Sequence, residues 1–214
     1  MSHVPSWPEI RAATASDRGR QRHENQDACV LIPEQRLFIL SDGMGGQNAG
    51  AVASRAVVSV LPRLVEQKLG NRQHLSDEEV LQKLKEAATE LNIGLHEEAA
   101  TSPALHGMGA TVVLAMLYGC CVAHIMHLGD SRGYLFRERH LRQLTQDHTV
   151  AAVLVRLQEI TLEDARALPE LQRLSRYVGM EGAARPDVQT VQMKAGDRIL
   201  LCSDGLTRML SDDE

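Results

Sequence analysis

Four aspartates lie at or beside the ends of apolar segments with the character of buried strands. Asp42 ends LFILSD, Asp204 ends RILLCSD, Asp130 follows AHIMHLG, and Asp27 opens DACVLI. A carboxylate at the end of a buried strand is costly unless a cation pairs with it or a metal binds it. Because several arrive in the same way, we expect one shared acidic site. Oxygen ligands without thiolates or imidazoles suit Mg²⁺ or Mn²⁺.

The Asp-Gly steps also have a simpler interpretation. Taken singly, an Asp-Gly between two strands is usually a type I′ hairpin turn. Asp42, however, is followed by Met-Gly-Gly and a helical segment instead of a returning strand, and Ser-Asp-Gly recurs at Asp204. The recurrence favours a ligand site. A purely structural cation site stays open, but it leaves Arg22 without a role.

Arg22 lies five residues before Asp27. Its planar guanidinium suits bidentate binding of a phosphate. A pair of metal ions generates hydroxide at neutral pH, so an arginine beside such a pair indicates hydrolysis of a phosphate ester. His23 is adjacent; it is better explained as a solvated side chain, with assistance to proton transfer as the alternative.

The remaining histidines and the cysteines give weaker signals. His124 and His127 are three apart in a strand-like segment, so they should face opposite sides and not share a metal. His148 stays undecided because a helix starts near it. No cysteine stands in a C-x-x-C or a phosphate-loop context, which favours buried, reduced thiols and argues against a cysteine phosphatase. The four cysteines are Cys29, Cys120, Cys121 and Cys202.

The elements that would position these residues are antiparallel strands with two long helices between them. Apolar periodicity predicts helices over 50–69, where Pro62 should kink or end the first part, over 77–98, and in two pieces within 148–168. Ser76 with Glu79, and Thr161 with Asp164, have the spacing of capping boxes. This pattern indicates an α+β fold. Strands are predicted over 28–32, 37–41, 110–117, 120–128, 133–137, 140–144, 188–193 and 198–203.

Composition and charge limit the class of protein. The chain has 214 residues, 43% of them apolar and 24% charged, which suits one soluble domain. No apolar run reaches the length of a membrane span and the first residues do not resemble a secretory signal, so we expect a cytoplasmic protein. A net charge of −5 argues against general nucleic-acid binding.

Taken together, these motifs resemble those of the metal-dependent serine/threonine protein phosphatases of type 2C. The resemblance covers nearly the whole chain, and the motifs occur in the family's order. They are 16–27 (SDRGRQRHENQD), 42–46 (DGMGG), 107–111 (GMGAT), 129–132 (GDSR), 144–148 (LTQDH), 173–179 (RLSRYVG) and 203–207 (SDGLT).

The resemblance implies a four-layer αββα sandwich, in which helix pairs flank two antiparallel sheets and two Mn²⁺ or Mg²⁺ ions lie between the sheets. Asp42 would bridge the ions with the Gly43 carbonyl on one of them, and Asp204 would hold the other. Asp130 and Asp204 would form a weaker third site. Asp27 would act through metal-bound water.

The implied reaction is hydrolysis of phosphoserine and phosphothreonine in proteins by a metal-activated water. Arg22 would bind the phosphate, and residues about 148–172 would form a flap that touches the substrate protein. A Ser/Thr kinase, or its targets, would be partners, and we expect a monomer. The alternative is a metal-binding pseudophosphatase that binds phosphoproteins without turnover.

Two departures from the family pattern affect these expectations. Met44 stands where many members carry a histidine proposed as general acid, so a water would protonate the leaving group. The family's late Asp-Asn pair is missing, and Asp212 and Asp213 stand where a helix should begin. We therefore expect residues 1–214 to form a single catalytic domain, incomplete at its C-terminus and weakly active or inactive.

Overall fold

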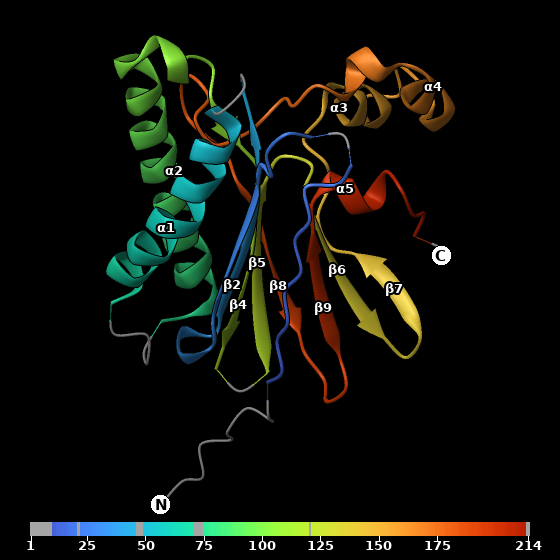
Figure 1. Ribbon diagram of the computed structural model, residues 1–214. Coiled ribbons are helices and arrows are strands. Elements are labelled where there is room, and N and C mark those ends of the chain that lie inside the picture. Colours follow the sequence, from blue (N-terminus) through green and yellow to red (C-terminus); the bar gives the residue numbers. More distant parts are fainter. Residues whose placement is uncertain (1–9, 21, 46–48, 71–74, 120, 213–214) are drawn as a thin grey trace, which may run out of the picture.

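The computed structural model describes residues 10–20, 22–45, 49–70, 75–119 and 121–212. Two antiparallel sheets face each other, and a pair of long helices covers the outer side of the larger sheet (Figure 1). The larger sheet has the order β1-β2-β4-β5-β8, with β3 paired to β2, and the smaller has the order β7-β6-β9.

The bounds of the elements follow the expected segments closely. The larger sheet consists of β1 (Asp27–Ile32), β2 (Leu37–Met44), β3 (Gly109–Ala110), β4 (Val112–Tyr118), β5 (Val122–Leu128) and β8 (Asp187–Gln192). The smaller sheet consists of β6 (Arg132–Arg137), β7 (His140–Gln143) and β9 (Arg198–Cys202). The helices are α1 (Ala49–Leu69), α2 (Asp77–Thr101), α3 (Val150–Arg156), α4 (Leu162–Ala167) and α5 (Asp204–Thr207), with 3-10 turns η1 (Pro33–Gln35), η3 (Pro103–Leu105) and η4 (Pro169–Gln172).

The main core lies between the larger sheet and the helix pair. Along β2 every second residue is buried, and Leu37 and Ile39 on that face pack against Val57 and Leu61 of α1 in the same cluster. Apolar side chains of β4 and β5 complete this layer. The apolar residues that recur every second position along the strand therefore pack against those that recur every 3.6 positions along the helix.

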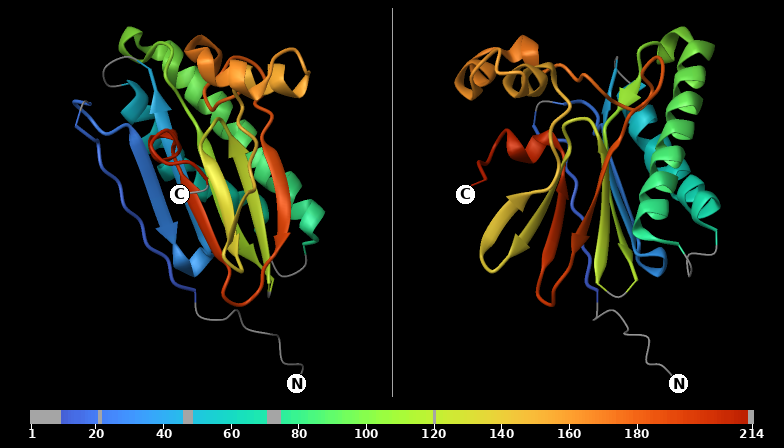
Figure 2. Two further views of the ribbon diagram at one scale, coloured as in Figure 1. Left: turned by 90° about the vertical axis from the view of Figure 1, so that its right-hand side faces the viewer. Right: turned by 180° about the vertical axis from the view of Figure 1, so that it is seen from behind.

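A second, smaller core lies between the two sheets. It contains Ile125 of β5, Leu135 of β6 and Val191 of β8. Beside it a cavity of about 750 Å³ opens between β1, β2, β4 and β9, and residues 10–16 run along it. Figure 2 shows the smaller sheet on the opposite side of the larger sheet from α1 and α2.

The helix signals in the sequence are confirmed with small differences. Helix α1 runs through Pro62 without ending, and α2 continues three residues past the predicted end. Both capping boxes are present, at Ser76 and at Thr161. Asp212, where the sequence predicts the beginning of a helix, lies in a turn and accepts a hydrogen bond from the Tyr134 hydroxyl; that helix stays a prediction. Asp213 lies outside the described residues.

Residues 150–172, which we call the flap, form a small unit above the sheets (Figure 1). Its segments α3, α4 and η4 pack chiefly on one another. The chain enters and leaves the flap through a neck, where Thr149 pairs with Leu174. This unit lies within the segment of about 148–172 that the sequence predicts as a flap, and its contact with a substrate protein stays a prediction.

The expected fold class, α+β with two antiparallel sheets, is confirmed. Among the described residues one helix pair is present, against the larger sheet, and no second pair covers the smaller one. In the same residues no helix is long and apolar enough to cross a membrane. The described cysteines form no disulfide; Cys202 is buried, whereas Cys29 and Cys121 are only half-buried, and Cys120 lies outside the description.

Candidate active site

The two strands at the edge of the larger sheet bring the first two aspartates together. Asp27 opens β1 and stands opposite Asp42 of β2 in the antiparallel register. The Gly43 N–H donates to the Gln26 carbonyl at 3.0 Å, which continues the pairing past Asp27. A sequence separation of fifteen residues is thus reduced to a direct cross-strand pair.

Thr111, between β3 and β4, fixes the main chain of Asp42. The Asp42 N–H donates to Thr111 Oγ1 at 2.9 Å, and the Thr111 N–H donates to the Asp42 carbonyl at 2.8 Å. The Ser41 hydroxyl also donates to the Thr111 carbonyl. Thr111 therefore binds both the N–H and the carbonyl of Asp42, and so fixes the main chain that carries its carboxylate.

The same threonine links Asp42 to the turn that carries Asp130. Thr111 Oγ1 lies 2.6 Å from Ser131 Oγ, and both hydroxyls are buried. Gly129 precedes Asp130 with φ +105°, and a Cβ there would lie 2.6 Å from Thr111 Cγ2. Only glycine combines that backbone angle with such close packing. The turn after β5 therefore packs closely on Thr111, which in turn binds the main chain of Asp42.

Asp204 reaches the same end from the smaller sheet. It is the first residue of α5, one residue beyond the end of β9, and its carboxylate forms an ion pair with Arg208 at 2.6 Å. The preceding residue, Ser203, donates its hydroxyl to Asp27 Oδ2 at 2.8 Å. One hydrogen bond thus joins the two sheets at the acidic end, by which we mean Asp27, Asp42, Asp130 and Asp204.

The acidic end carries more negative charge than its surroundings neutralise. Burial and the neighbouring carboxylates of Asp27 and Asp204 raise the pKa of Asp42 to about 8. Burial, with Asp204 and Asp147 nearby, raises the pKa of Asp130 to about 6. Like charges that share a buried site disfavour ionisation in this way. A bound cation would remove that cost.

The donor set fits the divalent ions that the sequence predicts. Carboxylate oxygens are hard ligands, which Mn²⁺ and Mg²⁺ prefer. The raised pKa values show that the negative charge of the cluster is not balanced by the protein, and a divalent cation would balance it. The Gly43 carbonyl lies in the same region, where α1 begins. A Cβ on Gly43 would lie 1.8 Å from the Gly50 carbonyl oxygen, so the main chain approaches α1 in a way that only glycine permits.

Arg22 lies at the exposed edge of the acidic end. Its Nη1 donates to Gln26 Oε1 at 3.3 Å, and Gln26 immediately precedes Asp27. The guanidinium is otherwise open to solvent, as a phosphate-binding group must be before substrate arrives. The position agrees with the expected role without testing it.

Comparison with known proteins decides the family. The family model described as protein phosphatase 2C matches residues 17–214. The chain belongs to the protein phosphatase 2C family. The serine/threonine phosphatase stp of Listeria monocytogenes is 38% identical over 208 residues, which cover 96% of this chain and 81% of that protein.

Solved structures agree with this family assignment. The serine/threonine phosphatase PstP/Ppp of Mycobacterium tuberculosis superposes with a TM-score of 0.79 at 37% identity, covering 93% of this chain and 80% of that one. A structure of the PstP catalytic domain in complex with two manganese ions gives a TM-score of 0.72 at 32% identity, covering 93% and 79%. The expected family, fold and enzyme class are confirmed.

Within this 2C-type framework, Met44 takes no acid or base role. It pairs with Gly109 across β2 and β3, and a Cβ on Gly109 would lie 2.8 Å from Met44 Cε and 2.7 Å from the Tyr177 ring. The thioether therefore fills space beneath Tyr177, and proton donation by residue 44 is absent.

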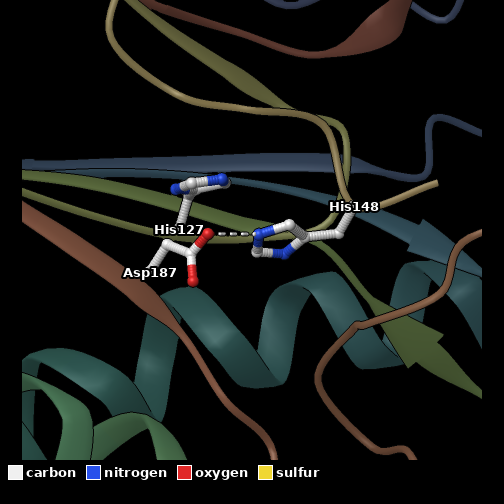
Figure 3. A group of neighbouring side chains, drawn as sticks. All are labelled: His127, His148 and Asp187. Carbon is white, nitrogen blue, oxygen red and sulfur yellow. Dashed lines mark hydrogen bonds and ion pairs between the residues drawn. The ribbon is translucent and has the colours of Figure 1, made fainter. Parts of the chain in front are cut away.

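A second cluster was not expected from the sequence. His127, His148 and Asp187 place ligand-type atoms within 4.8 Å of one another (Figure 3). His124 is also buried, but its Nε2 lies 3.3 Å from Asp77 Oδ1, so the two histidines of the strand have different neighbours. His148 was undecided, and Asp187 carried no signal beyond its place at the start of a strand.

Proposed function

We propose that this protein hydrolyses phosphoserine and phosphothreonine in proteins, with Mn²⁺ or Mg²⁺ as cofactor. The observation that carries the proposal is the uncompensated charge of the acidic end, where the pKa of Asp42 is raised to about 8. Family membership and the manganese in a related PstP structure support it. Bound divalent cations would supply a polarised water and neutralise charge on the phosphoryl group.

The carboxylates would divide the metal binding between them. Asp42 would bridge two ions with the Gly43 carbonyl on one, Asp204 would hold the other, and Asp130 with Asp204 would hold a weaker third. Asp27 would contact the metals through water, and its carboxylate is already oriented by the Ser203 hydroxyl. The cross-strand pairing of Asp27 with Asp42 supports this division, because it sets two carboxylates side by side.

Arg22 would hold the phosphoryl oxygens at the solvent side of the acidic end. A guanidinium suits this task, since two parallel N–H groups orient a phosphate as well as attract it. No proton donor stands at residue 44, so the leaving alkoxide would take its proton from water. The flap would contact the protein that carries the phosphate.

The decisive experiment measures phosphate release from a phosphothreonine peptide with and without Mn²⁺, in the longer form of the protein described below. Metal-dependent release that is abolished by EDTA and restored by Mn²⁺ supports the proposal. Tight Mn²⁺ binding by calorimetry without any release would instead support the alternative, a pseudophosphatase that binds phosphoproteins without turnover. Failure to bind either metal would contradict both.

The domain organisation is also proposed here, as a single catalytic domain that a further segment completes. The chain covers 81% of the Listeria phosphatase and about 80% of the PstP/Ppp structure. The 750 Å³ cavity between the sheets is lined by apolar side chains of β1, β2 and β9, which such a segment would cover. A longer form should bind Mn²⁺ more tightly and turn over faster than residues 1–214. Equal affinity and equal kcat would contradict this.

The partners follow from the reaction. Phosphoproteins are the substrates, and the Ser/Thr kinase that produces them is the proposed signalling partner. Co-purification of a kinase substrate with a catalytically impaired variant would test it. The monomeric state and the cytoplasmic location stay predictions.

A further inference from the structure

The flap reaches the rest of the molecule through its neck. The Val150 N–H donates to the Arg173 carbonyl at 2.9 Å, and the Ser175 N–H donates to the His148 carbonyl at 2.8 Å. Because α3, α4 and η4 pack chiefly on one another, the position of the neck decides where the flap stands. The residues that fix the neck therefore influence the whole flap.

His148 joins the neck to the turn that carries Asp130. Its N–H donates to the Gly129 carbonyl at 3.0 Å, and its ring Nδ1 accepts from the Gly129 N–H at 3.2 Å. His148 thus binds both the N–H and the carbonyl of Gly129, the first through its ring and the second through its main chain. The ring is 2% exposed, so water does not compete for these bonds.

The other ring nitrogen of His148 connects to the far side of the neck. Since Nδ1 accepts, the proton of the neutral ring is on Nε2, which donates to Asp187 Oδ2 at 3.0 Å (Figure 3). Asp187 in turn accepts two bonds from Arg176, at 2.8 and 3.1 Å. Arg176 lies two residues after Leu174 of the neck and also donates to the Arg185 carbonyl.

The charges in this chain of contacts are balanced. Although burial opposes its ionisation, hydrogen bonds from Arg176 and His148 lower the pKa of Asp187 below its usual range. Burial, and His127 beside it, lower the pKa of His148 to about 4, so the ring is neutral at pH 7. His127 stacks on the ring with centroids 4.4 Å apart and donates Nε2–H to the Gln146 carbonyl.

The same contacts argue against a metal in this cluster. His148 uses both ring nitrogens, His127 uses Nε2 as a donor, and the Asp187 carboxylate is engaged by Arg176. Among the ring nitrogens of His127 and His148, only His127 Nδ1 keeps a free lone pair in this hydrogen-bond pattern. One available nitrogen beside a guanidinium is a poor site for a cation.

We propose that His148, Asp187 and Arg176, which we call the clasp, are positioning residues that hold the flap neck against the Asp130 turn. The clasp joins the neck of the flap to the turn that carries Asp130; under the proposed function, the flap would contact the phosphoprotein and Asp130 would hold a metal ion. His148 touches neither substrate nor metal and acts through Gly129 on one side and Asp187 on the other. The inference relies on the proposed phosphatase activity for its kinetic test alone.

Two isosteric variants separate the two sides of His148. In His148→Asn, the amide oxygen can replace Nδ1 as acceptor for Gly129, but the bond to Asp187 is lost. In His148→Gln, the longer amide can donate to Asp187, but the acceptor for Gly129 is lost. Arg176→Gln breaks the clasp at a position with its side chain 26% exposed, where folding is less at risk.

The kinetic test compares a phosphothreonine protein with p-nitrophenyl phosphate, a small ester that carries no protein for the flap to contact. We expect His148→Asn and Arg176→Gln to raise KM for the phosphoprotein about tenfold, the scale of one hydrogen bond to a charged group, with KM for the small ester unchanged. His148→Gln should lower kcat for both substrates. Equal changes on both substrates in His148→Asn and in Arg176→Gln would overturn the division of roles.

A second readout needs no activity. Trypsin cleaves after arginine, and the exposed Arg156 and Arg173 lie in the flap and at its neck. His148→Asn and Arg176→Gln should speed cleavage there about tenfold relative to the body of the protein, while circular dichroism stays unchanged. Cleavage at the parental rate in both variants would overturn the clasp. Zinc that co-purifies with the parent and is lost in His148→Asn would assign the cluster to a metal instead.

Discussion

The acidic end and the clasp are both close groups of ionisable side chains, yet they differ in how their charges are balanced. In the acidic end four carboxylates meet, with Arg208 paired to one of them, and the pKa of Asp42 rises to about 8. In the clasp a carboxylate meets a bidentate arginine, and the pKa of Asp187 falls. One group needs a cation from outside and the other contains its own.

The comparison separates geometry from electrostatics as guides to a ligand site. The clasp and His127 hold three ligand-type atoms within 4.8 Å, which is the tighter arrangement. Every one of its short contacts, however, satisfies a donor with an acceptor inside the protein. An incomplete charge balance is therefore a better sign of an ion site than the closeness of histidine and carboxylate atoms.

The largest expected effect tests whether the acidic end, and not the clasp, binds the metal. In an active form of the protein, Asp42→Ala should reduce Mn²⁺-dependent turnover at least about 1,000-fold, because the bridging ligand supplies several kcal/mol of transition-state stabilisation through the metals. The matched control is Asp187→Asn, which should bind Mn²⁺ with the parental affinity in calorimetry. Near-normal activity in Asp42→Ala would contradict the two-metal assignment.

Asp130→Ala sharpens the comparison within the acidic end. It should leave the two tight Mn²⁺ sites in place and slow turnover about a hundredfold, since it removes the weak third cation and with it an acidic water. Calorimetry and single-turnover rates measure the two effects separately. Loss of the tight sites in this variant would show that Asp130 belongs with Asp42.

Arg22→Ala should have a smaller effect, confined to substrate binding. The guanidinium lies at the edge of the acidic end and holds no metal, so KM should rise about tenfold with Mn²⁺ affinity unchanged. Arg22→Lys is the matched control, because it keeps the charge and loses the bidentate geometry. If Mn²⁺ affinity fell and KM stayed constant, Arg22 would be a structural residue.

The smallest effect is a change in the pH dependence of stability. A carboxyl whose folded pKa is raised from 3.8 to about 8 favours the folded state below pH 4 and loses that contribution as the pH rises to 8. The metal-free protein should therefore melt at a lower temperature at pH 8 than at pH 5. Asp42→Asn should melt higher than the parent, with the larger gain at pH 8.

The clasp provides the opposite slope as a control. The folded pKa of His148 is lowered from 6.5 to about 4, so its contribution is present above pH 6.5 and is lost as the pH falls to 4. His148→Asn should flatten the acidic side of the melting curve and leave the alkaline side unchanged. A parental curve on the acidic side would contradict the neutral, buried ring.

Much of the acidic end was predictable because each aspartate lies at or near the end of a strand, and the apolar residues of that strand are adjacent in the sequence. Asp27, Asp42, Asp130 and Asp204 could each be placed at a strand end, and the order of the motifs identified the family. The sequence predicted that these aspartates share a site, but it did not predict that Asp27 pairs with Asp42. That register depends on which strands become neighbours in the sheet.

The clasp could not be predicted for the same reason. His148 and Asp187 are 39 residues apart and come together only because β5 pairs with β8 and the neck closes behind the flap. Thr111 belongs to a recognised motif, but the sequence did not indicate its role. The structure shows that it holds the Asp42 main chain. Pro62 shows the converse: packing of α1 on the sheet overrides a local signal to end the helix.

The neck between Thr149 and Leu174 has a consequence for how such a protein diversifies. Its closing bonds run between main-chain atoms, and main-chain bonds place little demand on the identity of the residues between them. The flap can therefore be exchanged for a segment of different length or sequence while the acidic end keeps its geometry. Recognition of a new phosphoprotein and preservation of the hydrolytic chemistry become separate problems, open to separate mutation.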